Sequence, residues 1–199
     1  MTDTPGTEEG LRARKRRETR QRIAEAGLRL FLKNGFEATT LDAIAAAADI
    51  SRRTFFHYFS SKEEVVNAFE SSADEAFRAA IADEPLDEAP LDAVRNAFLK
   101  VIASYETKQA IAIDGLLRST EALCARKQAN YARKEQMLFE ALSARWPDPE
   151  RRASLRLVAM VGVGALRLAA ETWSIEQGRR PLGDYLEEAF RGLRTEITT

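Results

Sequence analysis

The chain has 199 residues, of which 45% are hydrophobic and 31% charged, a composition typical of a folded globular protein. Its net charge of −1 means that any surface for a polyanion must be a local patch. A single cysteine, Cys124, and a single histidine, His57, exclude an internal disulfide and metal sites built from several such residues. The longest apolar run, Leu157 to Leu166, is too short to span a bilayer. The N-terminus lacks the apolar segment of a signal peptide. We therefore expect a cytoplasmic protein with no membrane partner.

Six prolines punctuate the chain, and none interrupts the long stretches of helical periodicity between them. Because proline breaks a helix interior, these stretches predict an all-α fold of about nine helices. The first three are expected at about residues 18–34, 41–48 and 52–59. A fourth is expected to end near Asp83, and five more to lie at about 91–106, 108–117, 119–146, 150–177 and 182–197. We divide the chain into a flexible basic arm (1–16), a DNA-binding domain (17–62) and a larger helical domain (63–199).

The second and third predicted helices are short and are joined by a tight turn, which is the geometry of a helix-turn-helix. Residues 10–60 hold eleven basic and five acidic residues, so this part of the chain is basic while the remainder is acidic. Such an asymmetry favours a polyanion as the partner of the basic part. Gly35 is expected to end the first helix with a positive φ. Thr39 or Thr40 is expected to cap the second helix, and Ser51 the third.

The segment TTLDAIAAAADISRRTFFHYFSSKEEV, from Thr39 to Val65, closely resembles the DNA-binding segment of the TetR-family transcriptional regulators. With IAEAGLRLFLKNGFEATT before it, the resemblance extends over the N-terminal 65 residues. The rest of the chain fits the family by its length and helical pattern. The spellings SRRTFFHYF and PLGDYLEEAF resemble the subgroup whose C-terminal domain binds an acyl-CoA-like ligand.

Two residues depart from the family pattern. Asp49 stands where the family prefers glycine in the turn, and aspartate tolerates the left-handed region better than most residues. Phe56 stands where the family often has a tyrosine that binds a phosphate. His57 or Tyr58 is therefore expected to supply that contact.

The start of the predicted recognition helix carries two arginines, Arg52 and Arg53, which would bind guanine edges or phosphates. Thr54 could contact a base, contact a phosphate or pack at the start of the helix. His57 could contact DNA or lie on the surface without a partner. Arginines of the arm would reach the minor groove or phosphates, or else only keep a tail soluble. The residues expected to contact DNA are Arg14, Arg16, Arg17, Thr40, Ser51, Arg52, Arg53, Thr54, His57, Tyr58 and Lys62.

The larger domain repeats apolar and aromatic residues at helical spacing, which indicates either an ordinary core or a cavity between helices. The candidates for contact with a ligand are Phe98, Ile102, Tyr105, Leu117, Tyr131, Leu138 and Trp173. Arg118 and Arg126 would meet an anionic end of that ligand, or else form surface ion pairs. The last two helices each carry an apolar face, the first of them with small residues, and these faces favour a dimer bundle over burial within one chain. The predicted dimer residues are Gly162, Leu166, Ala169, Tyr185, Phe190 and Leu193.

These features predict a dimeric, ligand-responsive repressor that binds a palindromic operator and is released by a small apolar effector. The resemblance implies that the effector is acyl-CoA-like. We expect no cofactor, metal or catalytic residue, because His57 and Cys124 lie far apart in the chain and suggest no nucleophile and base. The alternative is an architectural DNA-binding protein or a helical adaptor without a ligand, whose larger domain would contain no cavity.

Overall fold

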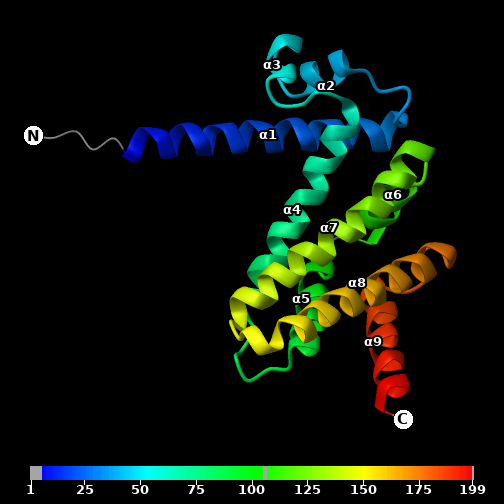
Figure 1. Ribbon diagram of the computed structural model, residues 1–199. Helices are drawn as coiled ribbons and strands as arrows, with labels where there is room; N and C mark the ends of the chain where they lie inside the picture. Colours follow the sequence, from blue (N-terminus) through cyan, green and yellow to red (C-terminus); the bar gives the residue numbers. More distant parts are fainter. Residues whose placement is uncertain (1–5, 105–106, 199) are drawn as a thin grey trace, which may run out of the picture. The chain divides into compact units, whose positions relative to one another are not determined.

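The computed structural model (Figure 1) describes residues 6–104 and 107–198. All regular structure in these ranges is helical, in nine α-helices and one short 3-10 helix, which confirms the predicted all-α fold. Two compact units divide between Ser72 and Ala73, inside helix α4 (Lys62–Asp83). We call them the head and the C-terminal domain. Tyr105, one of the predicted ligand residues, lies outside the described ranges.

The head contains α1 (Gly6–Asn34), α2 (Leu41–Ala47), α3 (Arg52–Phe56) and the first part of α4. Its core is apolar and aromatic, and Phe31, Phe55 and Phe59 are almost completely buried. Gly27 allows α1 to approach α4, because a Cβ atom there would lie 2.5 Å from Cγ1 of Val65. This close packing explains why the head extends to Ser72, beyond the boundary at residue 62 that the sequence suggested.

Helix α1 begins at Gly6, whereas the sequence analysis predicted a flexible arm over residues 1–16 and a helix from Glu18. The segment lacks an apolar stripe, but residues 6–17 include four arginines, two glutamates, one lysine and one alanine, which have high helix propensity. Arg14 and Glu18 also form an i,i+4 ion pair of 3.4 Å along the helix. The low apolar content of residues 6–16 therefore did not indicate whether this segment forms a helix.

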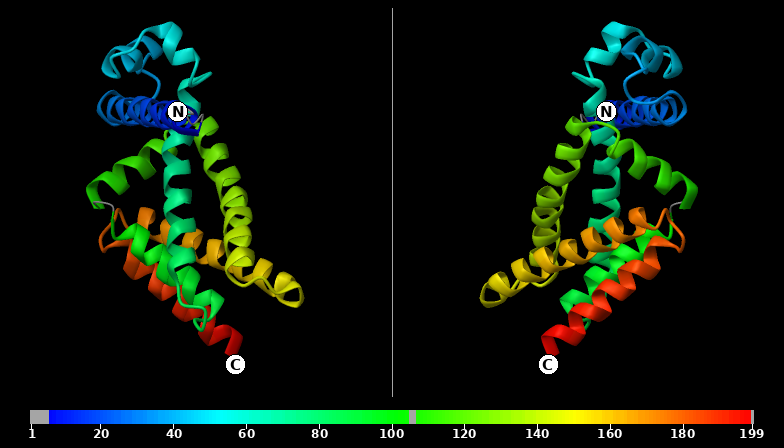
Figure 2. Two further views of the ribbon diagram at one scale, coloured as in Figure 1. Left: turned by 90° about the vertical axis from the view of Figure 1, so that its left-hand side faces the viewer. Right: turned by 90° about the vertical axis from the view of Figure 1, so that its right-hand side faces the viewer.

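The C-terminal domain is built around α8, which packs against α5, α7 and α9. Figure 2 shows α5, α8 and α9 lying together in both views. Phe98 on α5, Leu138 on α7 and Phe190 on α9 are almost completely buried in the shared core. The elements after α4 are α5 (Pro90–Ile102), α6 (Thr107–Leu117), α7 (Glu121–Arg145), the 3-10 helix η1 (Pro149–Arg151), α8 (Arg152–Ile175) and α9 (Leu182–Thr198).

The predicted dimer residues of α8 and α9 mostly point into this core. Leu166, Ala169, Tyr185 and Phe190 are buried within the one chain. A Cβ atom at Gly162 would lie 2.6 Å from Cγ1 of Val94 on α5, so this glycine serves packing inside the domain. Leu193 is half-buried. The prediction assigned these faces to a partner because a periodic pattern shows that a face is apolar but not what covers it.

The opposite face of α8 is exposed and also apolar. Leu157, Met160, Leu168 and Ile175 are 60%, 45%, 57% and 80% exposed. Their spacing of three, eight and seven residues keeps them on one side of the helix, away from the buried face. We call these four residues the α8 stripe.

With the turn before it, α8 is also long and apolar enough to meet a length-and-composition criterion for a membrane span, over Pro149–Ile175. Core helices of folded domains meet the same criterion. The buried face of α8, which includes Ala159, Val163 and Trp173, identifies it as the core helix of this domain.

A buried ion pair joins α4 to α7 within the C-terminal domain. Asp74 and Lys134 are 6% and 7% exposed, and the Lys134 ammonium donates to the Asp74 carboxylate. The same ammonium lies 4.6 Å from the centre of the Phe77 ring, and Nε of Arg133 lies 3.5 Å from Asp74. Because the partners are 60 residues apart in the sequence, no local pattern predicted them.

Candidate nucleic-acid interface and effector pocket

The recognition element consists of two short helices whose first turns are closed by hydroxyl caps. Thr40 Oγ1 accepts from the Ala43 amide at 3.1 Å, and Ser51 Oγ accepts from the Thr54 amide at 3.0 Å. Ser51 and Thr54 also share a hydroxyl hydrogen bond of 2.8 Å. Both predicted caps are confirmed, with Thr40 rather than Thr39 at the start of α2. These hydroxyls fix the beginnings of the helices while remaining near the surface.

The turn between α2 and α3 uses a left-handed residue, as predicted. Asp49 has φ of 52°, and the amide of Ile50 donates to the Ala45 carbonyl at 3.0 Å to close the turn. Gly35 ends α1 with φ of 85°, also as predicted. The turn between the two short helices therefore depends on the left-handed backbone conformation of Asp49, a residue other than glycine.

The two arginines at the start of α3 differ in their surroundings. Arg52 donates to Asp42 on α2 at 2.9 Å, and its guanidinium lies 5.9 Å from the Phe56 ring. Arg53 is exposed and has no ion-pair partner among the described residues. His57 is exposed directly after α3, and Tyr58 is half-buried. This end of the head therefore presents Arg53 and His57 to the solvent, with Arg52 held across to α2.

Lys62, which was predicted to hold a phosphate, is bonded inside the head. Its ammonium donates to the carbonyls of Phe36 at 2.8 Å and Glu37 at 3.3 Å. It also lies 4.4 Å from the centre of the Phe36 ring and 3.6 Å from the Glu37 carboxylate. The side chain ties the start of α4 to the chain just after α1. Sequence reasoning missed this role because the acceptors lie about 25 residues upstream.

The basic residues of α1 are displayed on a helix. Arg14, Arg16 and Arg17 are exposed, and Arg14 is paired with Glu18. Arg20, one turn further, lies over the Phe59 ring at 4.7 Å and belongs to the head itself. Arg16 and Arg17 thus project from a helix at a fixed spacing, whereas a flexible arm would let their positions vary.

The C-terminal domain contains a pocket of about 440 Å³ between the end of α5, α6, the end of α8 and the start of α9. We call it the α5–α9 pocket. Its position is set by Trp173, whose ring nitrogen donates to the Arg180 carbonyl at 3.2 Å. The lining residues are Leu99, Ile102, Ala103, Ala110, Trp173, Pro181, Leu182, Gly183, Asp184 and Glu187.

Of the predicted ligand residues, the structure brings Ile102 and Trp173 together at this pocket. Phe98 and Leu138 are completely buried in the core, where the Phe98 ring meets Phe77 edge to face at 5.0 Å. Leu117 is also buried. The apolar periodicity therefore mixed residues of the core with residues of the pocket wall, which look alike in a sequence.

Tyr131 lines a second, more polar pocket of about 270 Å³ between α6, α7 and α8, together with Arg118, Cys124, Lys127, Gln128, Glu171 and Ile175. Burial raises the pKa of Tyr131 to about 12, and the negative charges of Glu171 and Asp114 add to this effect. The phenol therefore keeps its proton at neutral pH. The guanidinium of Arg167 lies 5.6 Å from the centre of its ring and binds Glu171 at 2.9 Å.

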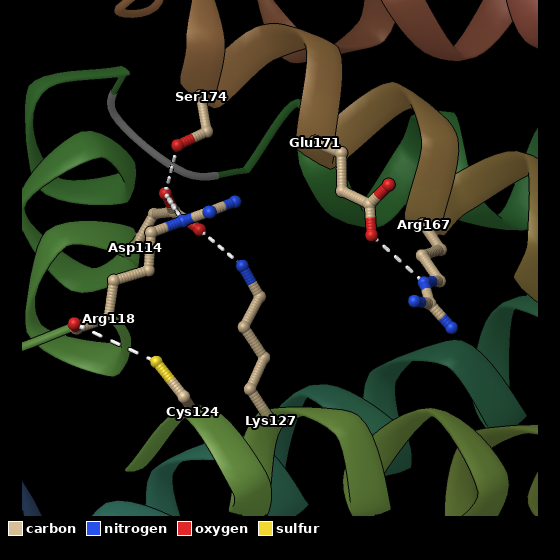
Figure 3. A network of polar contacts seen from close by, with 7 residues as sticks. All are labelled: Asp114, Arg118, Cys124, Lys127, Arg167, Glu171 and Ser174. Atoms are coloured by element: carbon tan, nitrogen blue, oxygen red, sulfur yellow. Dashed lines mark hydrogen bonds and ion pairs between the residues drawn. The ribbon is translucent and has the colours of Figure 1, made fainter. Parts of the chain in front are cut away.

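Beside this polar pocket, Asp114 of α6 joins three helices (Figure 3). Its carboxylate accepts from Lys127 of α7 at 2.5 Å, from Ser174 of α8 at 2.6 Å and from Arg118 at 2.9 Å. Burial opposes its ionisation, but the hydrogen bonds from Lys127 and Ser174, together with the positive charges of Lys127 and Arg118, leave the pKa of Asp114 below its ordinary value. Arg118, one of two arginines predicted to meet an anionic ligand, is thus already paired with a carboxylate.

Comparison with known proteins fits both parts of this description. A family model of bacterial regulatory proteins of the tetR family matches residues 23–69, and a model of the MftR C-terminal domain matches residues 88–198. The transcriptional regulator TcmR of Streptomyces glaucescens is 33% identical over 98% of this chain and 94% of its own length. The chain belongs to the TetR family of transcriptional regulators.

Solved structures of TetR-family proteins share the fold. The FadR repressor of Thermus thermophilus, in complex with lauroyl-CoA, is 25% identical with a TM-score of 0.55 and covers 86% of this chain and 91% of its own. A TetR-family regulator of Syntrophomonas wolfei is 18% identical with a TM-score of 0.65, over 92% of this chain and 96% of its own. This TetR-family chain therefore combines a helix-turn-helix head with a helical domain that holds the α5–α9 pocket and the polar pocket beside Tyr131.

Proposed function

We propose that this TetR-family protein is a dimeric repressor that binds a palindromic operator and is released by a small apolar effector. The observation that carries the proposal is the capped α2–turn–α3 element, with Arg53 exposed in the first turn of α3 and His57 exposed directly after this helix. In a helix-turn-helix the second helix lies in the major groove, and its N-terminal residues contact the base edges. Arg53 is the proposed base contact, because an arginine bonds both acceptors on the guanine edge.

The remaining DNA contacts are proposed from exposure and from the helix starts. Arg52, Thr54 and the caps Thr40 and Ser51 surround the start of α3 or α2, where amide groups attract phosphate oxygens. Tyr58 takes the phosphate contact that Phe56 cannot make. Arg14, Arg16 and Arg17 on α1 add a positive stripe, which makes binding dependent on salt.

The dimer is proposed to form through the α8 stripe rather than through the residues first predicted. Single apolar residues on a protein surface are common, but four large ones on one exposed helix face are typical of an interaction site. Leu193 of α9 is half-buried and keeps its proposed place in the dimer interface. Two helices from each chain would form a four-helix bundle about a two-fold axis. Two symmetric heads then read half-sites about 34 Å apart or slightly more.

The effector is proposed to occupy the α5–α9 pocket, whose wall is largely apolar. Its existence favours a ligand-responsive regulator over the architectural or adaptor alternative, which predicted a filled domain. The FadR structure of Thermus thermophilus is a complex with lauroyl-CoA, which supports the proposal that such a domain can take up a ligand with an apolar chain. To move the DNA-binding equilibrium from 1:99 to 99:1, the effector must prefer the released state by about 5.5 kcal/mol.

The proposal is tested by selecting bound duplexes from a random DNA pool with the purified protein. We expect a two-fold symmetric sequence to be enriched. Arg53→Ala should then lower affinity for that sequence by about 1–3 kcal/mol and relax the base preference at one position of each half-site. Arg29→Ala on the exposed surface of α1 is the matched control for loss of one head arginine. Failure to enrich any duplex would refute the proposed function.

A further inference from the structure

The wall and the rim of the α5–α9 pocket have different chemistry. Eight of its ten lining residues carry no charge, and the other two, Asp184 and Glu187, are carboxylates of α9. No lysine or arginine lines it. The two acids are three residues apart, so they lie on the same side of the helix.

Neither rim carboxylate has an ion-pair partner among the described residues. The nearest basic residue in the chain before them, Arg180, is bound to Glu188 by two hydrogen bonds of 2.5 and 3.0 Å. Its guanidinium also lies 4.3 Å from the Tyr185 ring. Arg180 is therefore paired with Glu188 and not with Asp184 or Glu187. These two carboxylates line the pocket and are exposed to solvent.

Three arginines lie in an adjoining groove between α5 and α9, which shares only Leu99 and Glu187 with the pocket. Arg95 and Arg194 both bind Asp92 there, and Arg191 completes the set. The arginines thus lie in the groove and not among the residues that line the pocket, and two of them are paired with Asp92. The charged residues that line the pocket itself are the two carboxylates.

We propose that the α5–α9 pocket selects an amphipathic cation, a ligand with a short alkyl or aryl body and one positive charge. The body is buried against Leu99, Ile102 and Trp173, while the charge lies beside Asp184 and Glu187. An anionic head at the same place would be repelled by both carboxylates. The inference rests on the proposed effector site and names the charge of its ligand.

Three probes with the same eight-carbon body separate the contributions: octyltrimethylammonium, octanol and octanoate. Binding to the full-length protein is measured by calorimetry without DNA, so the outcome does not depend on the proposed operator. We expect the cation to bind about ten-fold more tightly than octanol, and octanoate to bind most weakly. The quaternary ammonium keeps its charge at every pH, so protonation does not affect the comparison.

Asp184→Asn and Glu187→Gln should each weaken binding of the cation about three- to ten-fold and leave octanol unchanged, because partly exposed charges contribute modestly. The double variant should bind the cation and octanol alike. Glu196→Gln, an exposed acid of α9 outside the pocket, is the matched control and should have no effect.

Ala103→Phe locates the site, because Ala103 lines the pocket and is itself exposed. Because the phenylalanine ring would fill the pocket, the affinities for the cation and for octanol should both fall ten-fold or more. Octanoate binding as tightly as the cation would overturn the inference and point to the neighbouring arginines. Equal effects of Glu196→Gln and Glu187→Gln, or unchanged binding by Ala103→Phe, would also overturn it. None of these results would affect the DNA selection that tests the proposed function.

Discussion

The head and the C-terminal domain are stabilised in different ways. In the head, single residues fix the recognition element: Thr40 and Ser51 cap α2 and α3, and Gly35 and Asp49 adopt positive φ. The C-terminal domain also has local devices, such as the Thr120 cap of α7. Its buried polar contacts, however, join distant segments, as in the pairs Asp74–Lys134 and Asp114–Ser174. Short-range chemistry thus determines the recognition element, and long-range packing determines the domain that holds the pockets.

The two faces of α8 give the largest contrast. Ala169 is buried and Leu168 is exposed, although they are adjacent in the sequence. Ala169→Glu places an unpaired charge in the core and should cost more than about 3 kcal/mol, enough to unfold the C-terminal domain. Leu168→Glu should leave the helical circular dichroism unchanged and convert the proposed dimer into a monomer by light scattering. A wild-type protein that is monomeric at micromolar concentration would contradict the dimer proposal.

The buried ion pair tests long-range stabilisation directly. Lys134→Met leaves the Asp74 carboxylate buried with only Arg133 nearby, so the free energy of unfolding should fall by about 3 kcal/mol. Chemical denaturation measures the change. Arg133→Met, which removes the more exposed partner, should cost under about 1 kcal/mol. The double variant Asp74→Leu with Lys134→Met should recover most of the loss; if it is additive instead, the charges do not act as a pair.

In the head, Lys62 makes contacts of this long-range kind. Lys62→Met removes donation to the Phe36 and Glu37 carbonyls and should lower the stability of the head by about 1.5–3 kcal/mol. Thermal unfolding monitored by circular dichroism reports this change. At a temperature where the variant is folded, its affinity for the selected duplex should differ little from that of the wild type. A strong, uniform loss of DNA affinity without loss of stability would restore the phosphate role predicted from the sequence.

The smallest expected effect concerns backbone strain. Asp49 in the head and Gln177 in the C-terminal domain have φ of 52° and 54°. Glycine at either position relieves the left-handed strain but adds freedom to the unfolded chain. Asp49→Gly should therefore stabilise the protein by about 0.5 kcal/mol, and Gln177→Gly by slightly more because glutamine lacks the local bonding of aspartate. Denaturation midpoints measured side by side check the order.

The sequence predicted the head well because its signals are local. A hydroxyl before a helix and a glycine or aspartate in a turn each have one strong backbone preference, so Thr40, Ser51 and Asp49 were found without a structure. The same reasoning did not find the contacts of Lys62 within the head, because its acceptors lie in the connection between α1 and α2.

In the C-terminal domain, helix positions followed from proline spacing and periodicity, but the roles of side chains did not. Phe98 and Ile102 are one turn apart on α5, yet one lies in the core and the other on the pocket wall. Gly162 was assigned to a dimer and packs instead against Val94. Apolar residues of one helix are equivalent in a sequence until the neighbouring helices are placed.

Helix α4 has a consequence for folding. The division between the head and the C-terminal domain gives each of them eleven of its residues, 62–72 and 73–83. An isolated helix of eleven residues is only marginally stable in water, because forming the first turn is unfavourable and few backbone hydrogen bonds follow to offset its free-energy cost. Each half therefore forms with the help of the other. Unfolding of either part should fray the shared helix, which couples the two parts thermodynamically and lets them melt in a single cooperative transition.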